Sequence, residues 1–140
     1  MNILWVKDGK LGHEKQVEAL LEEIGSTQNI NITEIKASSV LNQILELITF
    51  GLLSKGIDGV ENIGFDLIIG AGSNTHLEMV NLKKRFKKAK AISILCPNIF
   101  FRKKFDYICV PNHDLHKRIS KQKSIFFEGS LSKIYDGPTE

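Results

Sequence analysis

The sequence predicts an α/β fold, a three-layer Rossmann-like domain with a mainly parallel sheet. Short apolar runs typical of buried strands alternate with amphipathic helical patterns along most of the chain. A helix between two strands returns the chain so that the second strand runs parallel to the first. The 140 residues, 42% of them hydrophobic, are enough for one core. We expect one domain over residues 1–127, with residues 128–140 forming a tail or leading into a second domain.

The first half of the chain contains two predicted strands and two predicted helices. Residues 1–6 are an apolar run of the kind found in strands that are buried on both faces. Residues 30–35 alternate apolar and polar side chains, as a half-buried strand does. The two helices are expected at residues 14–24, with Val17, Leu20, Leu21 and Ile24 on one face, and at residues 40–53, with a wide apolar stripe.

The second half of the chain continues the same alternation. Strands are expected at residues 65–69, 91–95, 107–110 and 124–127. A long amphipathic helix is expected at residues 75–88, with Met79, Leu82 and Phe86 facing inward. Cys96 and Cys109 lie in apolar runs, which favours two buried thiols over a disulfide or a metal pair.

Glycine and polar residues follow the predicted strands at the points where the strands end. The carboxyl ends of parallel strands meet at one edge of the sheet, which is where such folds bind ligands. Three of the four histidines belong to these segments, and this grouping favours a binding site over isolated surface histidines. The residues expected to gather there are Asp8, Gly9, Lys10, Gly12, His13, Gly72, Ser73, Thr75, His76, His113 and Asp114.

The first strand–helix connection has the composition of a loop that binds phosphate or sugar hydroxyls. Its two glycines, Gly9 and Gly12, allow backbone N–H groups to approach a ligand, and the helix that follows offers a positive dipole end. Lys10 is expected to pair with an anionic group of the ligand. His13 is expected to act as a general base or a hydrogen-bond donor. After the third strand, Ser73 or Asn74 also fits a simpler role as a helix N-cap.

Several classes of site are disfavoured by the sequence. A nicotinamide-binding fingerprint would need a third glycine where Thr75 stands and an acidic residue after the next strand, and both are missing. Neither a GxxxxGK[ST] phosphate loop nor a GxSxG nucleophile elbow is present. His113 and His116 have no second cluster of metal ligands to complement them. We therefore expect neither a metal nor a cofactor.

Charge is distributed unevenly along the chain. The balance is −6 over residues 1–80 and +11 over residues 81–123. Such a field attracts anionic surfaces. The first of its basic clusters equally fits a solvated helix face, and consists of Lys83, Lys84, Arg85, Lys87, Lys88 and Lys90. Nucleic acid is disfavoured because aromatic residues are not interleaved with the basic ones. The expected partner is instead an anionic membrane surface, contacted by apolar and basic residues. These are Phe100, Phe101, Arg102, Lys103 and Lys104.

Signals for membrane insertion or export are missing from the sequence. No run of about 18 apolar residues occurs. The short apolar run at the N-terminus does not have the form of a signal peptide. We therefore expect a cytoplasmic location, with association at the inner face of a membrane as a further option.

Three segments together resemble the mitochondrial-fission Elm-type family, whose fold is similar to that of GT-B glycosyltransferases. They are DGKLGHEKQ at residues 8–16, DLIIGAGSNTHL at residues 66–77 and FDYICVPNHD at residues 105–114. The first segment also resembles the GGTGGH loop of the N-acetylglucosaminyltransferase that completes the lipid-linked peptidoglycan precursor. His13 matches the histidine of that loop, while Asp8 and Lys10 replace a glycine and a threonine.

This resemblance implies the N-terminal, acceptor-side half of a GT-B fold. The expected ligand is a sugar or sugar-phosphate acceptor, which can be lipid-linked, and His13 is the expected catalytic residue. Hexosyl transfer would require a second, donor-binding domain, so the chain by itself is expected to be inactive. It is expected to be a fragment, one half of an enzyme whose other half is a separate polypeptide, or a domain that no longer catalyses. The alternative function is a non-enzymatic adaptor that recruits a protein through its basic surface.

Overall fold

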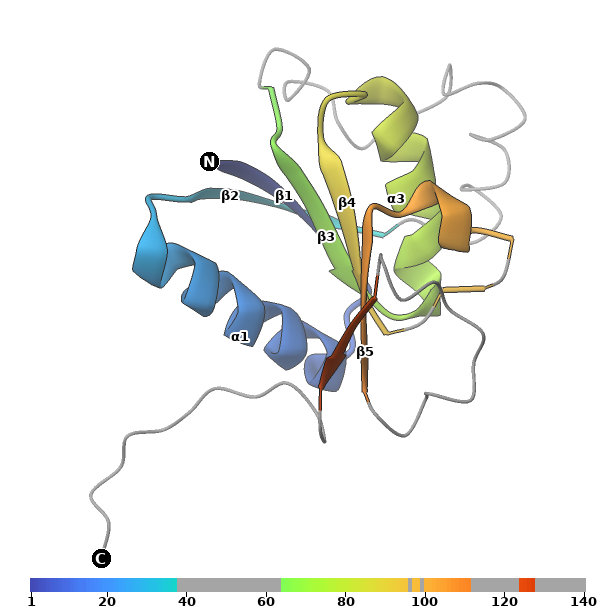
Figure 1. The fold of residues 1–140 in the computed structure, drawn as a ribbon, viewed down its shortest axis with the longest axis horizontal. Coiled ribbons are helices and arrows are strands. Elements are labelled where there is room, and N and C mark those ends of the chain that lie inside the picture. The colour runs from blue at the N-terminus through green and yellow to red at the C-terminus, as the bar shows by residue number, and fades with distance from the viewer. Residues whose placement is uncertain (38–63, 96, 99, 112–123, 128–140) are drawn as a thin grey trace, which may run out of the picture.

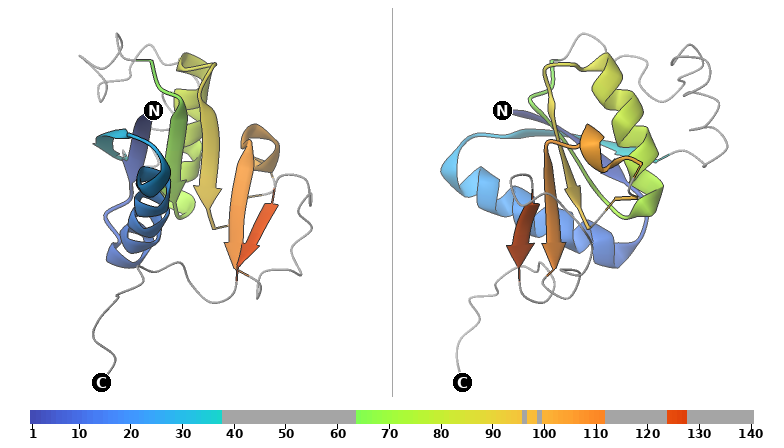
Figure 2. Two further views of the ribbon diagram at one scale, coloured as in Figure 1. Left: turned by 60° about the vertical axis from the view of Figure 1, so that its left-hand side comes forward. Right: turned by 45° about the vertical axis from the view of Figure 1, so that its right-hand side comes forward.

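The computed structural model describes residues 1–37, 64–95, 97–98, 100–111 and 124–127. These residues form one parallel sheet with helices on both of its faces (Figures 1 and 2). The elements are β1 (Asn2–Lys7), α1 (Leu11–Thr27), β2 (Asn31–Lys36), β3 (Leu67–Ala71), α3 (Ser73–Arg85), β4 (Lys90–Ile94), η1 (Arg102–Lys104), β5 (Tyr107–Pro111) and β6 (Ser124–Phe127).

The sheet has six strands in the order β2-β1-β3-β4-β5-β6, and every neighbouring pair runs parallel. The chain leaves β1 through α1 and returns to β2 on one side, whereas β3 pairs with the other side of β1. The chain therefore adds strands first on one side of β1 and then on the other, so the strand order reverses between β1 and β3. This reversal confirms the predicted Rossmann-like architecture and marks the position where such sheets bind ligands.

Two hydrophobic clusters fill the space between the sheet and its helices, and alternate residues of each strand supply them. On the α1 face, Ile3, Trp5 and Ile69 pack against Val17 and Leu21. On the α3 face, the buried strand residues pack against that helix. Figure 2 shows α3 on the opposite side of the sheet from α1. Members of this second cluster include Leu4, Val6, Ile68, Met79, Leu82 and Phe105.

Close contact between α3 and the sheet depends on a glycine. A methyl group on Gly70 would lie 2.9 Å from the Sδ of Met79 and 3.1 Å from the backbone oxygen of Val6. Both neighbours belong to the core, with exposed fractions of 0%. A side chain at position 70 would therefore push the helix away from the strand.

The structure confirms the predicted strands to within two residues at each end, as well as the two helices that it describes. The inward faces are also as predicted: Met79 and Leu82 are buried, and Phe86 packs against the same core.

Cys109 is a buried free thiol, and burial raises its pKa to about 11. The helix expected at residues 40–53, Cys96 and the tail at residues 128–140 lie outside the described residues. Among the described helices, none has the length and apolar character needed to cross a membrane.

Candidate functional site

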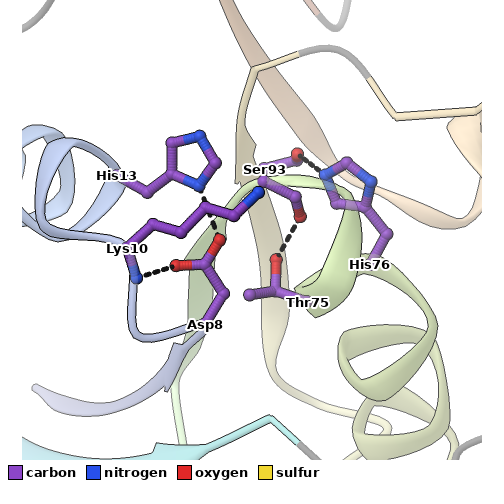
Figure 3. A network of polar contacts seen from close by, with 7 residues as sticks. Asp8, Lys10, His13, Thr75, His76 and Ser93 are labelled. Carbon is purple, nitrogen blue, oxygen red and sulfur yellow. Dashed lines mark hydrogen bonds and ion pairs between the residues drawn. The ribbon is translucent and has the colours of Figure 1, made fainter. Parts of the chain in front are cut away.

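The ends of β1 and β3 bring together two of the predicted segments at the carboxyl edge of the sheet. The two strands are neighbours, with Val6 opposite Gly70, so the residues that follow them start side by side. Figure 3 shows Asp8, Lys10 and His13 on one side and Thr75, His76 and Ser93 on the other. This part of the edge lies where the strand order reverses, and we call it the carboxyl-edge site.

The centre of the site is an Asp–His pair. Oδ2 of Asp8 lies 2.6 Å from Nδ1 of His13, while Oδ1 of Asp8 accepts a hydrogen bond of 2.9 Å from the backbone N–H of Lys10. The Asp8 side chain exposes 1% of its surface, whereas His13 exposes 25%. A buried carboxylate therefore holds a histidine that remains accessible from outside.

This geometry determines which nitrogen of His13 can react. A carboxylate only accepts hydrogen bonds, so in the neutral imidazole the proton is on Nδ1, facing Asp8. Nε2 then carries a lone pair, and Figure 3 shows this nitrogen pointing away from Asp8. His13 can therefore take a proton from a ligand hydroxyl, and Asp8 stabilises the imidazolium that results.

Two glycines shape the backbone around this pair. Gly9 has φ +81° and forms the turn between β1 and α1. Gly72 has φ +93° and ψ 156°, a conformation that is almost confined to glycine. A methyl group on Gly72 would lie 2.6 Å from Cε1 of His13 and 2.7 Å from Oδ2 of Asp8. The absence of a side chain at position 72 therefore makes room for the pair.

His76 is near the pair but makes internal contacts. It exposes 4% of its surface, and its ring packs edge-on against Phe105 with ring centroids 5.6 Å apart. The hydroxyl of Ser93 donates to the backbone oxygen of Leu95 at 2.8 Å. The Oγ of Ser93 therefore accepts from Nε2–H of His76, 3.0 Å away, so the neutral form of His76 has its proton on Nε2. Burial, with a smaller contribution from the charge of His13, lowers the pKa of His76 to about 4.

The low pKa of His76 predicts a loss of stability in acid. The unfolded chain takes up a proton at this residue as the pH falls through about 6.5, whereas the folded chain does so only near 4. Unfolding therefore becomes easier between these values, by about 3 kcal/mol at pH 4. The variant His76→Gln keeps an N–H donor for Ser93 and does not titrate, so its free energy of unfolding should fall less on acidification. Urea unfolding at pH 7 and pH 4.5 measures the difference, and equal falls in the two proteins would contradict it.

The end of β4 contains a strained residue next to this network. Leu95 has φ 74°, in the left-handed region that side chains with a Cβ disfavour. Its backbone N–H donates to the oxygen of Cys109 at 2.8 Å, and its backbone oxygen accepts from Ser93. Hydrogen bonds on both sides of the residue therefore hold the turn that ends β4.

The starts of both described helices differ from the sequence predictions. α1 begins at Leu11, three residues earlier than predicted, so Gly12 and His13 lie in its first turn and Lys10 is its N-cap. The N-cap of α3 is Gly72, so the role proposed for Ser73 or Asn74 is wrong. Ser73 is exposed in the first turn.

Thr75, predicted to bind substrate, is fully buried, and its hydroxyl donates to the backbone oxygen of Gly72 at 2.8 Å. Together with the N–H of Thr75, which donates to the same oxygen, this bond fixes the turn that carries Gly72. The binding roles predicted for Ser73, Thr75 and His76 stay predictions. His113 and Asp114 lie outside the described residues.

The predicted membrane-contacting residues divide between the core and the surface. Phe100 exposes 82% of its surface, and Lys103 and Lys104 are exposed as well. Phe101 instead packs against the core on the α3 face, and Nε of Arg102 donates to the backbone oxygen of Pro97 at 3.1 Å. The exposed part of this segment is thus Phe100 with the two lysines.

The lysine-rich segment at the end of α3 is partly used within the fold. Nζ of Lys83 contacts the carboxylate of Asp106 and donates to the backbone oxygen of Ala89 at 2.9 Å. Lys90 lies 3.9 Å from the same carboxylate. These contacts tie the end of α3 to the sheet, whereas Lys87 and Lys88 are exposed.

One further residue near the start of α1 was not singled out by the sequence. The Oε1 of Gln16, on α1, is buried and has no hydrogen-bond partner within the described residues. Glutamine is common on helix surfaces, so nothing in the sequence distinguishes this position. His13 three residues earlier is the signal that could have drawn attention to it.

Comparisons with known proteins agree with the motifs. The model of a family described as Mitochondrial fission ELM1 matches residues 11–138. A protein of Rickettsia prowazekii (strain Madrid E), named Uncharacterized protein RP120, is 28% identical over 116 residues. That alignment covers 81% of this chain and 32% of the relative, so the chain spans about a third of the relative's length.

Proposed function

The chain belongs to the mitochondrial fission ELM1 family, and on this premise we propose that it is the acceptor-side domain of a glycosyltransferase-like protein of GT-B type. His13 takes the proton from a hydroxyl group of a phosphate-bearing or lipid-linked sugar acceptor. The hydrogen-bonded pair of Asp8 and His13 is the observation that carries this proposal, because its geometry leaves a basic nitrogen facing outward.

The surroundings of the pair suit an anionic acceptor. The first turn of α1 presents the backbone N–H groups of a helix N-terminus beside His13. Lys10 is exposed at that terminus, and Figure 3 shows its side chain extending toward the side of the site formed by Thr75 and Ser93. A phosphate group on the acceptor would be attracted to this end of the helix while a sugar hydroxyl approaches His13.

The proposed step transfers a hexosyl group from a nucleotide sugar. The proton of the acceptor hydroxyl moves to Nε2 of His13, and the oxygen bonds to the anomeric carbon of the donor. The bond from that carbon to the nucleoside diphosphate breaks, and the diphosphate leaves with the bonding electrons. We expect the donor to bind on another domain or a second polypeptide, so this chain alone binds the acceptor without transferring sugar to it.

Titration with a sugar phosphate tests the acceptor site on this chain alone. We expect α-D-glucose 1-phosphate to shift the backbone amide NMR signals of Gly9, Gly12 and Gly72. The signal of Gly25, which lies near the far end of α1, should shift less. Methyl α-D-glucopyranoside, which has no phosphate, should bind more weakly. Equal small shifts throughout the chain with both probes would contradict the acceptor site and favour the adaptor function.

We also infer that the exposed segment of Phe100, Lys103 and Lys104 contacts an anionic membrane, where a lipid-linked acceptor would be located. An exposed aromatic ring can enter the interface while nearby lysines pair with lipid headgroups.

The double variant Lys103→Glu/Lys104→Glu should lower sedimentation with phosphatidylglycerol vesicles by about tenfold or more. The matched control Lys87→Glu/Lys88→Glu changes the net charge equally at exposed residues that follow α3, and should sediment almost as wild type does. Equal losses in both variants would indicate general charge attraction, and failure of the wild type to sediment would end the membrane proposal.

A further inference from the structure

The side chain of Gln16, three residues after His13 in α1, has an unmet hydrogen-bonding capacity. Its Oε1 is buried, and no donor reaches it among the described residues. A buried amide oxygen without a partner loses its bonds to water and gains nothing in return, so it destabilises the folded state. Native proteins keep such groups when water, an ion or a ligand satisfies them.

The helical geometry directs this amide toward the site. Gln16 lies three residues after His13 and four after Gly12, so the three residues share one side of the first turns of α1. Side chains on a helix lean toward its N-terminus and cover the preceding turn. This preference directs the side chain of Gln16 toward the turn that contains Gly12 and His13.

Gly12 itself is exposed. A methyl group built on it would meet no atom within 4 Å apart from its chain neighbours and the backbone of its own helix. A ligand can approach the backbone there with His13 and Gln16 beside it. Rotation of an amide about its last side-chain torsion is soft, so Gln16 can turn its polar end toward such a ligand at small cost.

We propose that Gln16 is a second acceptor-binding group, which hydrogen-bonds a hydroxyl next to the one that His13 activates. This inference rests on the proposed function and adds to it the substrate class: an acceptor sugar with neighbouring hydroxyl groups. An acceptor with a single hydroxyl would leave the amide of Gln16 unsatisfied in the complex. The site therefore discriminates between these two kinds of acceptor.

The variant Gln16→Met separates this role from a structural one. Methionine has a similar length and shape but no amide, so the folded state no longer buries an unpartnered oxygen. We expect the Tm to rise by about 3–5 °C. The Kd for α-D-glucose 1-phosphate should weaken by about five- to tenfold. The Kd for inorganic phosphate, which has no ring hydroxyls, should stay the same.

The control Gln28→Met makes the same exchange at an exposed position at the other end of α1, and should change neither the Tm nor the Kd. A lower Tm for Gln16→Met would show that the amide has a structural partner and would overturn the inference. Unchanged binding of the sugar phosphate by that variant would overturn it as well, while leaving the role of His13 in place. If the wild type binds no sugar phosphate, the proposed function and the inference fail together.

Discussion

Replacing Asp8 with Asn is expected to lower sugar transfer by about a hundredfold or more while the fold stays intact. Oδ1 of Asp8 accepts from the backbone N–H of Lys10. In Asp8→Asn the amide oxygen keeps this bond, so the NH₂ group occupies the place of Oδ2 and donates to Nδ1 of His13. The neutral imidazole must then carry its proton on Nε2, which can no longer act as a base.

Transfer is measured with a nucleotide sugar, a phosphate-bearing acceptor and the donor-binding domain present. His13→Ala should show a similar loss, and the double variant should be no worse than either single one, because the two residues act as a unit. Asp66→Asn removes a carboxylate at the opposite edge of the sheet, where it accepts from the N–H of Asn2, and should leave transfer unchanged. Full transfer by Asp8→Asn would show that the tautomer of His13 is irrelevant to the reaction.

Replacing Gly72 with Ala is expected to be the most damaging small substitution at the carboxyl-edge site. The backbone at position 72, with φ +93° and ψ 156°, costs a residue with a Cβ about 1–3 kcal/mol. The added methyl group would also overlap Cε1 of His13 and Oδ2 of Asp8, and the carboxylate is buried and unable to retreat freely. Together these effects should lower the free energy of unfolding by about 2–4 kcal/mol.

Urea unfolding measures this loss, and the NMR signals of the His13 ring report whether the imidazole has moved. Gly64→Ala is the matched control, because a methyl group there meets nothing within 4 Å and its φ lies outside the left-handed region. Its unfolding free energy should stay within about 0.5 kcal/mol of wild type. Equal stability of the Gly72 and Gly64 variants, with His13 signals in place, would contradict the close packing of His13 over Gly72.

The sheet and its binding edge could be predicted because they follow from patterns that are local in the sequence. Apolar runs of strand length separated by amphipathic helices require parallel strands, and parallel strands bring their carboxyl ends together. Asp8, His13 and Gly72 were therefore expected at the same edge. Their actual roles differ in detail: Asp8 holds His13, and Gly72 makes room for both, because side chains and turns from separate segments meet there.

The details that sequence patterns missed depend on contacts between distant segments. α1 begins at Leu11 without a side-chain cap, so no Ser, Thr, Asp or Asn signalled its start. Phe100 and Phe101 are chemically alike, and only the turn before η1 points one outward and the other into the core. His76 is buried, and its ring N–H donates to Ser93, seventeen residues later.

The state of His13 in the free protein tests the account most directly. Long-range ¹H–¹⁵N NMR of the His13 ring distinguishes a protonated ring nitrogen from a bare one. The contact with Asp8 predicts a proton on Nδ1 and a bare Nε2 in the neutral imidazole, reversed in Asp8→Asn. A proton on Nε2 in the wild type, or the same tautomer in both proteins, would contradict a general base at this edge of the sheet.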